Sequence, residues 1–180
     1  MPKLETERLL LRPPDFRDVP AITTWLGDLD VAKNLATVSH PYREEDARGF
    51  VTRAVERRAA GEEFVFAIER KEESMFIGCS GLRLKDGQFR LGYWLGRPFW
   101  GQGYASEAAK KVVSFAFHDL KAGSVGAGWF HDNPASGRVL EKLGFRHVGA
   151  EQHLSEARGR EVPCHMMTLT REEFGRKRAA

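Results

Sequence analysis

Two periods of apolar residues run through the chain and predict its elements. Between residues 47 and 55 the apolar positions recur at i, i+3, i+4, i+7 and i+8, which predicts an amphipathic helix. Runs rich in aromatic and β-branched residues at 64–68, 76–84 and 89–95 predict strands. Because Asp86-Gly87 is a strong signal for a tight hairpin turn, the last two of these strands are predicted to be antiparallel.

The N-terminal part is predicted to hold a strand and a helix before this region. Residues 6–13 have the composition of a strand of about five residues that ends at Pro13 and Pro14. Asp15 and Asp18 are candidate caps for the helix that follows. Residues 27–43 show no periodic pattern and are predicted to be irregular.

Downstream, a stripe of mostly small residues at 105–116 predicts a helix that packs closely against a sheet. Residues 125–130 predict a short strand. Asn133 and Pro134 then provide the N-cap and the first position of another helix, and Gly144 provides its C-terminal cap.

The last two strands are predicted at 145–148 and 162–169, with a polar loop at 151–161 between them. The resulting order, β-α-α-β-β-β-α-β-α-β-β, predicts an α+β fold with one mixed, mainly antiparallel sheet and helices on its faces. No linker or internal repeat interrupts the 180 residues, so we expect one domain over residues 1–180.

Composition excludes several classes of protein. The net charge of +3, from 28 basic and 25 acidic residues, is too balanced to indicate a nucleic-acid partner. No window resembles a signal peptide or approaches the ~20 apolar residues of a membrane span. Cys79 and Cys164 are the only cysteines, so neither a disulfide framework nor a metal site is expected. We therefore expect a cytoplasmic protein that works without a metal or a membrane.

Candidate chemistry begins where the strand at 89–95 gives way to the helix at 105–116. Gly101 and Gly103 lie at this junction, and glycines allow backbone to approach a ligand closely. The first N–H groups of a helix have no intrahelical partner, and the helix dipole adds positive charge there. A strand, a glycine turn and a helix start therefore predict an anion site, with phosphate as its usual occupant.

Three segments together resemble the GNAT superfamily of N-acetyltransferases, and within it the ribosomal-protein-alanine acetyltransferases (the RimJ/RimL-like branch). The first is TERLLLR at 6–12, which resembles the opening strand of that branch. The second is GYWL followed by WGQGYASEA within 92–108, which resembles the acetyl-CoA pyrophosphate loop. The third is NPASGRVLEKLGF at 133–145, which resembles the later helix on the cofactor side. The resemblance covers nearly the whole chain in the right order.

The resemblance implies a sheet that is splayed between its fourth and fifth strands, with acetyl-CoA as the acyl donor in the gap. The pantetheine arm is expected to pair with the backbone of Trp94, Leu95 and Gly96. The pyrophosphate is expected on the loop and helix start, at Gly101, Gln102, Gly103, Tyr104, Ala105 and Ser106. The later helix is expected to contact the cofactor through Asn133, Ser136 and Arg138.

The resemblance also implies two catalytic positions. Ser136 corresponds to the serine that protonates the leaving thiol, and a backbone N–H of the strand at 89–95, near Tyr93 or Trp94, is predicted to polarise the thioester carbonyl. Two positions depart from the family pattern. Pro98 stands where Arg or Gln is common, so cofactor binding is predicted to depend on backbone groups. Arg90 stands where the branch often carries an acid, so that position offers no general base.

The predicted acceptor is a primary amine that attacks directly in a ternary complex. An α-amine with a pKa of about 7.8 is neutral far more often at pH 7 than a lysine with a pKa of about 10.4, a difference of about 3.5 kcal/mol. In the absence of an evident strong base, this favours a protein N-terminus or a small-molecule amine. Specificity is expected in residues 27–43 and 151–161, and the assembly is expected to be a monomer or a homodimer.

Other interpretations remain at this point. Gly101-x-Gly103 could belong to a nicotinamide or flavin site, but the third glycine of that fingerprint is replaced by Ser106. The same fold could serve as a non-catalytic acyl-CoA sensor. His131 could act as a base or could be a hydrogen-bonded loop residue, and Glu107 could complement the helix dipole.

Overall fold

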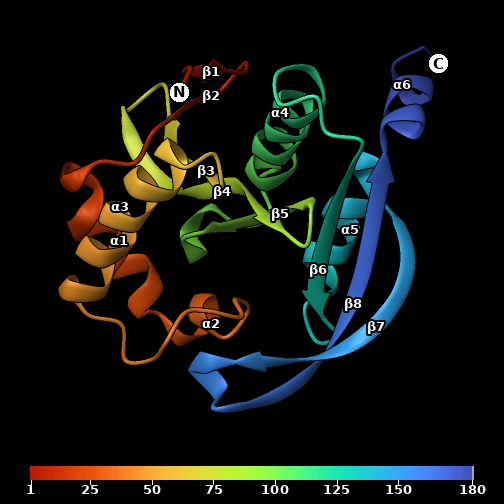
Figure 1. Cartoon of the computed structure of the whole chain (residues 1–180). Coiled ribbons are helices and arrows are strands. Elements are labelled where there is room, and N and C mark those ends of the chain that lie inside the picture. Colours follow the sequence, from red (N-terminus) through yellow and green to blue (C-terminus); the bar gives the residue numbers. More distant parts are fainter. Residues whose placement is uncertain (180) are drawn as a thin grey trace.

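The computed structural model describes residues 1–179, with side chains to residue 176, and its framework is one eight-stranded sheet (Figure 1). The strands are β1 (Leu4–Glu5), β2 (Leu9–Arg12), β3 (Glu63–Arg70), β4 (Met75–Lys85), β5 (Gln88–Leu95), β6 (Ser124–Phe130), β7 (Arg146–Ser155) and β8 (Arg160–Thr170). The α-helices are α1 (Val19–Gly27), α2 (Leu29–Ala32), α3 (Glu44–Ala59), α4 (Tyr104–His118), α5 (Pro134–Leu143) and α6 (Arg171–Ala179). Short 3-10 helices cover Phe16–Asp18 (η1), Arg97–Phe99 (η2) and Glu156–Arg158 (η3).

The strands lie in the order β1-β2-β3-β4-β5-β6-β8-β7. Every neighbouring pair is antiparallel except β5 and β6, which are parallel. This order confirms the predicted mixed, mainly antiparallel sheet. The predicted fourth and fifth strands are β5 and β6, because β1 was not predicted.

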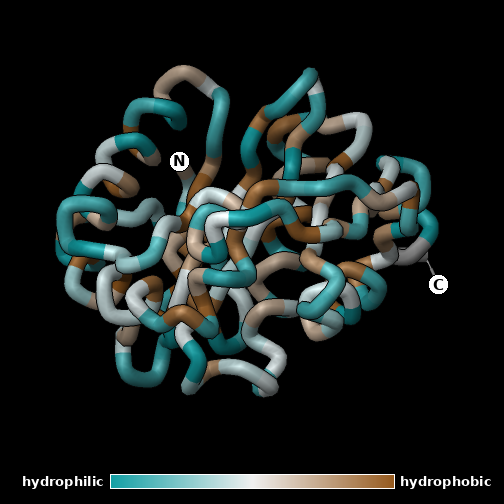
Figure 2. Tube along the Cα trace, turned by 90° about the horizontal axis from the view of Figure 1, so that it is seen from below, coloured by the Kyte–Doolittle hydropathy of each residue, from teal (hydrophilic) through white to brown (hydrophobic). Residues whose placement is uncertain are grey.

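Helices cover the two faces of the sheet unequally. α1 and α3 pack against β3 and β4 on one face, while α4 packs on the other face and α5 lies beside it (Figure 1). Two apolar clusters result, one around α4 and one between α1, α3 and the sheet. Hydrophobic segments lie inside the fold and hydrophilic segments run through the outer loops (Figure 2). The small residues predicted on α4 pack as expected, since Ala108, Ala109 and Ala116 are fully buried.

Local signals in the sequence placed several boundaries correctly. Asp86 and Gly87 both have positive φ, at 50° and 75°, and form the turn between β4 and β5. The Asn133 side chain accepts a hydrogen bond from the backbone N–H of Ser136 at the start of α5. Gly144 ends this helix in the left-handed conformation, at φ 97°.

The N-terminal strand is present, and one cap prediction needs correction. The strand predicted within residues 6–13 is β2 at Leu9–Arg12, and residues 6–8 turn to meet α4. Asp15 does cap a helix, but this is η1. Asp18 does not cap α1 with its side chain, because its buried carboxylate accepts two hydrogen bonds from Arg12, at 2.8 and 2.7 Å.

Two segments predicted to be irregular are ordered elements. Residues 27–43 contain α2, which the Asp28 side chain caps by accepting from the Asp30 N–H. Residues 151–161 were predicted to be a loop, but β7 and β8 extend through most of them. Only residues 156–159 connect the two strands, and η3 covers the first three of these residues.

The sheet opens between β5 and β6. Only Phe89, Arg90 and Leu91 pair with β6, at Val125, Gly126 and Ala127. Beyond Leu91 and Ala127 both strands continue without pairing to each other, to Leu95 and Phe130. The predicted splay is therefore present.

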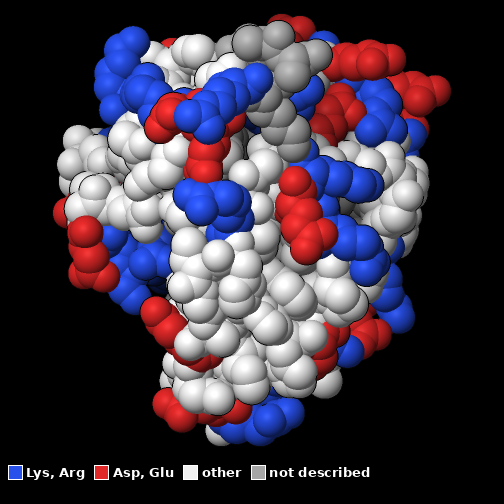
Figure 3. Space-filling view, turned by 90° about the vertical axis from the view of Figure 1, so that its right-hand side faces the viewer, with Lys and Arg blue, Asp and Glu red and all other residues white. Residues whose placement is uncertain are grey.

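The surface agrees with the balanced composition. The face that lies at the right of Figure 1 shows basic and acidic side chains interspersed around a broad uncharged area (Figure 3). Among the helices of the described residues, none has the length and apolarity needed to cross a bilayer.

Candidate active site

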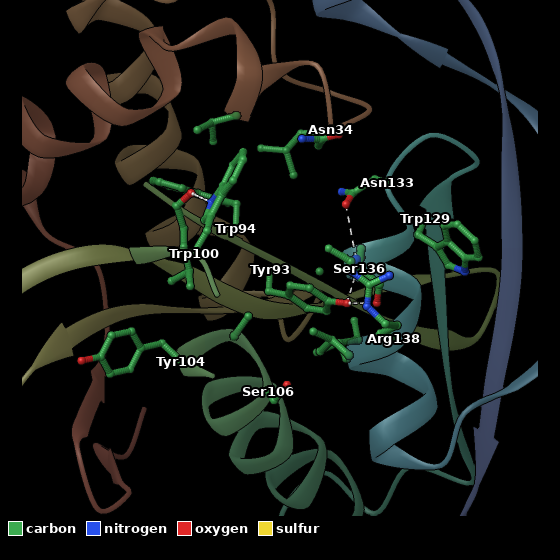
Figure 4. Close-up of a pocket in the computed structure, with 18 of the residues that line it drawn as sticks. Asn34, Tyr93, Trp94, Trp100, Tyr104, Ser106, Trp129, Asn133, Ser136 and Arg138 are labelled. Atoms are coloured by element: carbon green, nitrogen blue, oxygen red, sulfur yellow. Dashed lines mark hydrogen bonds between the residues drawn. The ribbon is translucent and has the colours of Figure 1, made fainter. Parts of the chain in front are cut away.

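A cavity of about 490 Å³ lies where β5 and β6 separate. Its walls come from β5 and β6, from the loop and first turn of α4, from α5, and from the segment after α2. Figure 4 shows Tyr93 of β5 reaching across this space to Ser136 of α5, with Ser106 of α4 below them. The volume lies within the range of small-molecule sites in proteins.

The glycine turn has the conformation that an anion site requires. Gly101 and Gly103 have φ of 74° and 82°, and Gly103 is the N-cap of α4. Its carbonyl accepts the first helical hydrogen bond, from the Glu107 N–H at 3.0 Å. The N–H groups of Tyr104, Ala105 and Ser106 therefore precede the first intrahelical bond, and all three residues line the cavity.

Arg8 holds this turn in place from outside. One of its guanidinium nitrogens donates to the Gln102 carbonyl at 3.0 Å, and its Nε donates to Glu107 at 2.7 Å. The guanidinium also lies over the Tyr104 ring, 4.3 Å from its centroid. The Tyr104 ring is consequently buried and turned away from Ser136 (Figure 4), so Tyr104 offers the cavity its backbone rather than its phenol.

Glu107 does more than complement the dipole of α4, because it also makes several hydrogen bonds to the N-terminal segment. It accepts hydrogen bonds from the Thr6 hydroxyl at 2.6 Å and from the Arg8 N–H at 3.0 Å, in addition to the Arg8 side chain. Burial alone would raise the pKa of Glu107, but these hydrogen bonds outweigh it and hold that pKa below its usual value. Glu107 thus links the N-terminal segment to the first turn of α4.

The free edge of β5 presents backbone groups to the cavity. The Gly96 N–H donates to the Ile77 carbonyl on β4, at 2.9 Å. Because backbone groups alternate sides along a strand, the N–H groups of Leu95 and Tyr93 point the opposite way, toward the gap. The Leu95 carbonyl accepts from Trp100 Nε1 at 2.8 Å, which fixes the indole beside the opening.

Two predicted cofactor residues, Gly96 and Gln102, are not among the residues that line the cavity. Both backbone groups of Gly96 are bonded, to Ile77 and Phe99. A side chain at Gly96 would clash with the Trp25 ring, at 2.6 Å, so this glycine serves helix packing. The Gln102 side chain turns back and donates to the Pro98 carbonyl at 2.8 Å, which stabilises the turn.

Tyr93 and Ser136 form a hydrogen-bonded pair at the centre of the site. The Tyr93 phenol donates to the Ser136 carbonyl at 2.9 Å, and its oxygen lies 2.9 Å from Ser136 Oγ. Burial raises the pKa of Tyr93 to about 12, against a smaller opposing effect of the Ser136 bond. The phenol therefore stays protonated at physiological pH. Sequence reasoning assigned only the Tyr93 backbone to the site and missed this contact of its side chain.

One face of α5 completes the wall. Ala135, Arg138, Val139 and Lys142 line the cavity at a spacing of one helical turn, and Asn133 lies at its start. Arg138 and Lys142 are exposed cations at the rim. This face of α5 is therefore suited to bind anionic groups at the rim of the cavity.

A second cavity, of about 200 Å³, adjoins the first. The two share four lining residues, which are Asn34, Ala36, Gly128 and Trp129. The segments 27–43 and 151–161 meet beside this second cavity. Arg158 Nε donates to the Lys33 carbonyl at 2.9 Å, and the Glu156 N–H donates to the Ala36 carbonyl at 3.1 Å.

Arg158 also binds Asp132, with contacts of 2.6 and 3.1 Å. The hydrogen bonds from Arg158 lower the pKa of Asp132, so the pair stays ionised at neutral pH. His131, a candidate base, lies outside the residues that line either cavity, and its backbone N–H donates to Pro163. Among the described residues, no group of His, Cys, Asp and Glu side chains is arranged to hold a metal ion.

Sequence reasoning missed the residues that hold the site together. Arg8 belonged to a recognised segment, but nothing in its local pattern showed that it would meet Gln102 and Glu107 about 100 positions later. Arg158 lay in a segment predicted to be a loop. Trp100 belonged to a recognised segment, but its local pattern did not show that its indole would donate to the Leu95 carbonyl.

Comparison with known proteins places these features in a family. The family model described as the acetyltransferase (GNAT) domain matches residues 8–146. The chain is 30% identical over 178 residues to the uncharacterised N-acetyltransferase p20 of Bacillus licheniformis, covering 97% of this chain and 99% of that one.

Solved structures share the fold. A GNAT-family acetyltransferase from Bacillus anthracis superposes with a TM-score of 0.83 at 25% identity, covering 96% of this chain and all of the other. The RimL ribosomal-protein α-N-acetyltransferase, solved with coenzyme A, superposes with a TM-score of 0.82 at 19% identity, covering 94% of this chain and 98% of that one.

Proposed function

The chain belongs to the acetyltransferase (GNAT) family, and from that premise we propose that it transfers the acetyl group of acetyl-CoA to a primary amine in a ternary complex. The acceptor is an N-terminal α-amine of a protein or a small-molecule amine. The observation that supports this most is the cavity at the β5–β6 splay, which runs from the glycine turn to the Tyr93–Ser136 pair. The RimL structure that shares this fold holds coenzyme A, which agrees with CoA as the carrier.

The cofactor is bound in three parts. The pyrophosphate lies on the backbone N–H groups of Gly103 to Ser106, where the helix dipole and the glycine conformations favour an anion. Arg138 and Lys142 provide positive charge for the outer phosphates. The pantetheine arm lies along the free edge of β5, in the place where β6 no longer pairs with it. There the N–H groups of Tyr93 and Leu95 point into the gap.

Catalysis then follows from the groups at the centre. The amine attacks the thioester carbon, and the Tyr93 N–H stabilises the negative charge that develops on the carbonyl oxygen. When the C–S bond breaks, Ser136 Oγ donates its proton to the leaving sulfur, and the proton that the acylated nitrogen loses returns the serine to its neutral form. Tyr93 positions the serine, because its phenol donates to the Ser136 carbonyl and its oxygen accepts the serine hydrogen until that hydrogen turns to the sulfur.

The acceptor must be deprotonated before it attacks. Arg90 cannot accept a proton, since a guanidinium remains charged in proteins. Low-pKa amines are therefore favoured over lysine by about 3.5 kcal/mol at neutral pH.

Release of CoA thiol, measured with acetyl-CoA and a panel of amines, tests the proposal. We expect turnover with α-amines and much slower turnover with Nα-blocked lysine. Tight acetyl-CoA binding without turnover of any amine would instead favour an acyl-CoA sensor.

A further inference from the structure

Arg90 is a cation beside the second cavity, and it has no hydrogen-bond or ion-pair partner among residues 1–176, whose side chains the structure describes. Its Nε is buried, yet it makes no hydrogen bond to any described residue. The side chain crosses β6 over Gly126, where a Cβ would approach Arg90 Cδ to 3.0 Å and Nε to 3.3 Å. Gly126 therefore provides the space for this arginine, at the cost of leaving a buried donor unsatisfied.

The neighbours of Arg90 make the cavity positive. Arg83 is directly opposite Arg90 in the β4–β5 ladder and so lies on the same face of the sheet. Lys85 lies two positions further along that face and lines the second cavity. Arg83 also lies opposite Glu63 in the β3–β4 ladder, so the cations that line the cavity itself are Arg90 and Lys85.

Glu151 is the acidic residue that lines this cavity. Its carboxylate is hydrogen-bonded to His153 Nε2, at 3.0 Å. Hydrogen bonding by His153 lowers the pKa of Glu151, and Arg90 and Lys85 lower it further through space. One carboxylate that already has a partner does not neutralise two cations, and its presence favours a monoanionic ligand over a dianionic phosphate.

The second cavity is continuous with the proposed reaction centre. The two cavities share Gly128 and Trp129 of β6. Arg90 and Tyr93 are three residues apart on β5, which corresponds to about 10 Å between their Cα atoms. One acceptor molecule can therefore present its amine at the splay and a second group at Arg90.

We propose that Arg90 binds a carboxylate of the amine acceptor, which makes the substrate class a primary amine with an acidic group several bonds from the nitrogen. The planar guanidinium fork is matched to a carboxylate, and Arg90 lines the second cavity without an ion-pair partner of its own among residues 1–176. This inference rests on the proposed function, because it names the acceptor of the same site.

Matched acceptor pairs test the inference through kcat/KM. The first pair is the C-terminally amidated peptides Ala-Glu-Ala and Ala-Gln-Ala, and the second is the α-amides of glutamate and glutamine. We expect the acidic member to be preferred by about 10-fold or more, as for a charge-assisted hydrogen bond. The pair with the larger preference shows whether the source is a peptide or a free small molecule.

Variants assign the preference to Arg90. We expect Arg90→Gln to abolish it and Arg90→Lys to retain part of it. Arg90→Glu should favour the amidated peptide Ala-Lys-Ala over Ala-Glu-Ala. Arg48→Gln, which removes an exposed charge on α3, is the matched control and should keep the wild-type preference.

Each variant is first checked for an unchanged acetyl-CoA Kd, which shows that it is folded. If the wild type uses both members of each pair equally, or if Arg90→Gln lowers both equally, the inference is wrong and the proposed function stands. If the folded, acetyl-CoA-binding wild type acetylates none of the amines, both are wrong.

Discussion

At Ser136 a single hydroxyl hydrogen has two possible destinations, the Tyr93 oxygen and the sulfur of the leaving thiol. In the structure the phenol and Ser136 Oγ are 2.9 Å apart. We expect Ser136→Ala to lower kcat by about 100-fold, the lower end of the range for general acid catalysis. Tyr93→Phe should lower it less, by about 10-fold, since it removes only the group that orients the serine. Ser136→Thr keeps a hydroxyl and is the matched control; equal loss with Ala and Thr would contradict the assignment.

The buried phenol of Tyr93 also determines how kcat depends on pH. Burial raises the pKa of Tyr93 to about 12, so the protonated donor form persists at every pH below that value. We therefore expect kcat to rise as the acceptor amine loses its proton and then to stay level up to about pH 10. A profile that falls near pH 9 in the wild type, and not in Tyr93→Phe, would show that the phenol titrates much earlier than its burial predicts.

At the glycine turn before α4, the effect of a substitution on acetyl-CoA binding can be separated from its effect on stability. Gly101 has φ 74° and no atom near the position of a Cβ, and Gly61 at the end of α3 has the same φ and the same open space. Alanine at either position should cost about 1 kcal/mol of stability. Only Gly101→Ala should raise the acetyl-CoA KM, by about 10-fold, because only Gly101 lines the cavity. An equal KM for both variants in steady-state kinetics would exclude the turn as the phosphate site.

Elements with local signals were predictable, and those without them were not. Asn133, Pro134 and Gly144 defined α5 because caps act within a few residues. The strand predicted at 145–148 continues as β7 to Ser155, and this extension escaped prediction because most of its residues are exposed and left no apolar period in the sequence. α2 has four residues, too few to show a helical period. In the site, the glycine turn was predictable from spacing, but the contacts of Arg8, Tyr93 and Arg158 depend on tertiary packing.

At the scale of the whole molecule, Arg158 joins the segment after α2 to η3 and to Asp132, and so holds two distant parts of the chain beside the second cavity. We expect Arg158→Gln to raise the acceptor KM by about 10-fold and to leave the acetyl-CoA KM nearly unchanged, because the glycine turn lies elsewhere. Arg17→Gln, at an exposed arginine of η1, is the control. Steady-state kinetics with each substrate varied in turn separates the two KM values, and a parallel rise in both would contradict this role.

The central claim is that acetyl-CoA occupies the gap between β5 and β6 and brings its sulfur to Ser136. A crystal structure with coenzyme A bound tests it most directly. We expect the pyrophosphate on the backbone N–H groups of residues 103–106, the arm along the free edge of β5, and the sulfur within hydrogen-bonding reach of Ser136 Oγ. Coenzyme A bound away from the splay, or a sulfur remote from Ser136, would show that this placement is wrong.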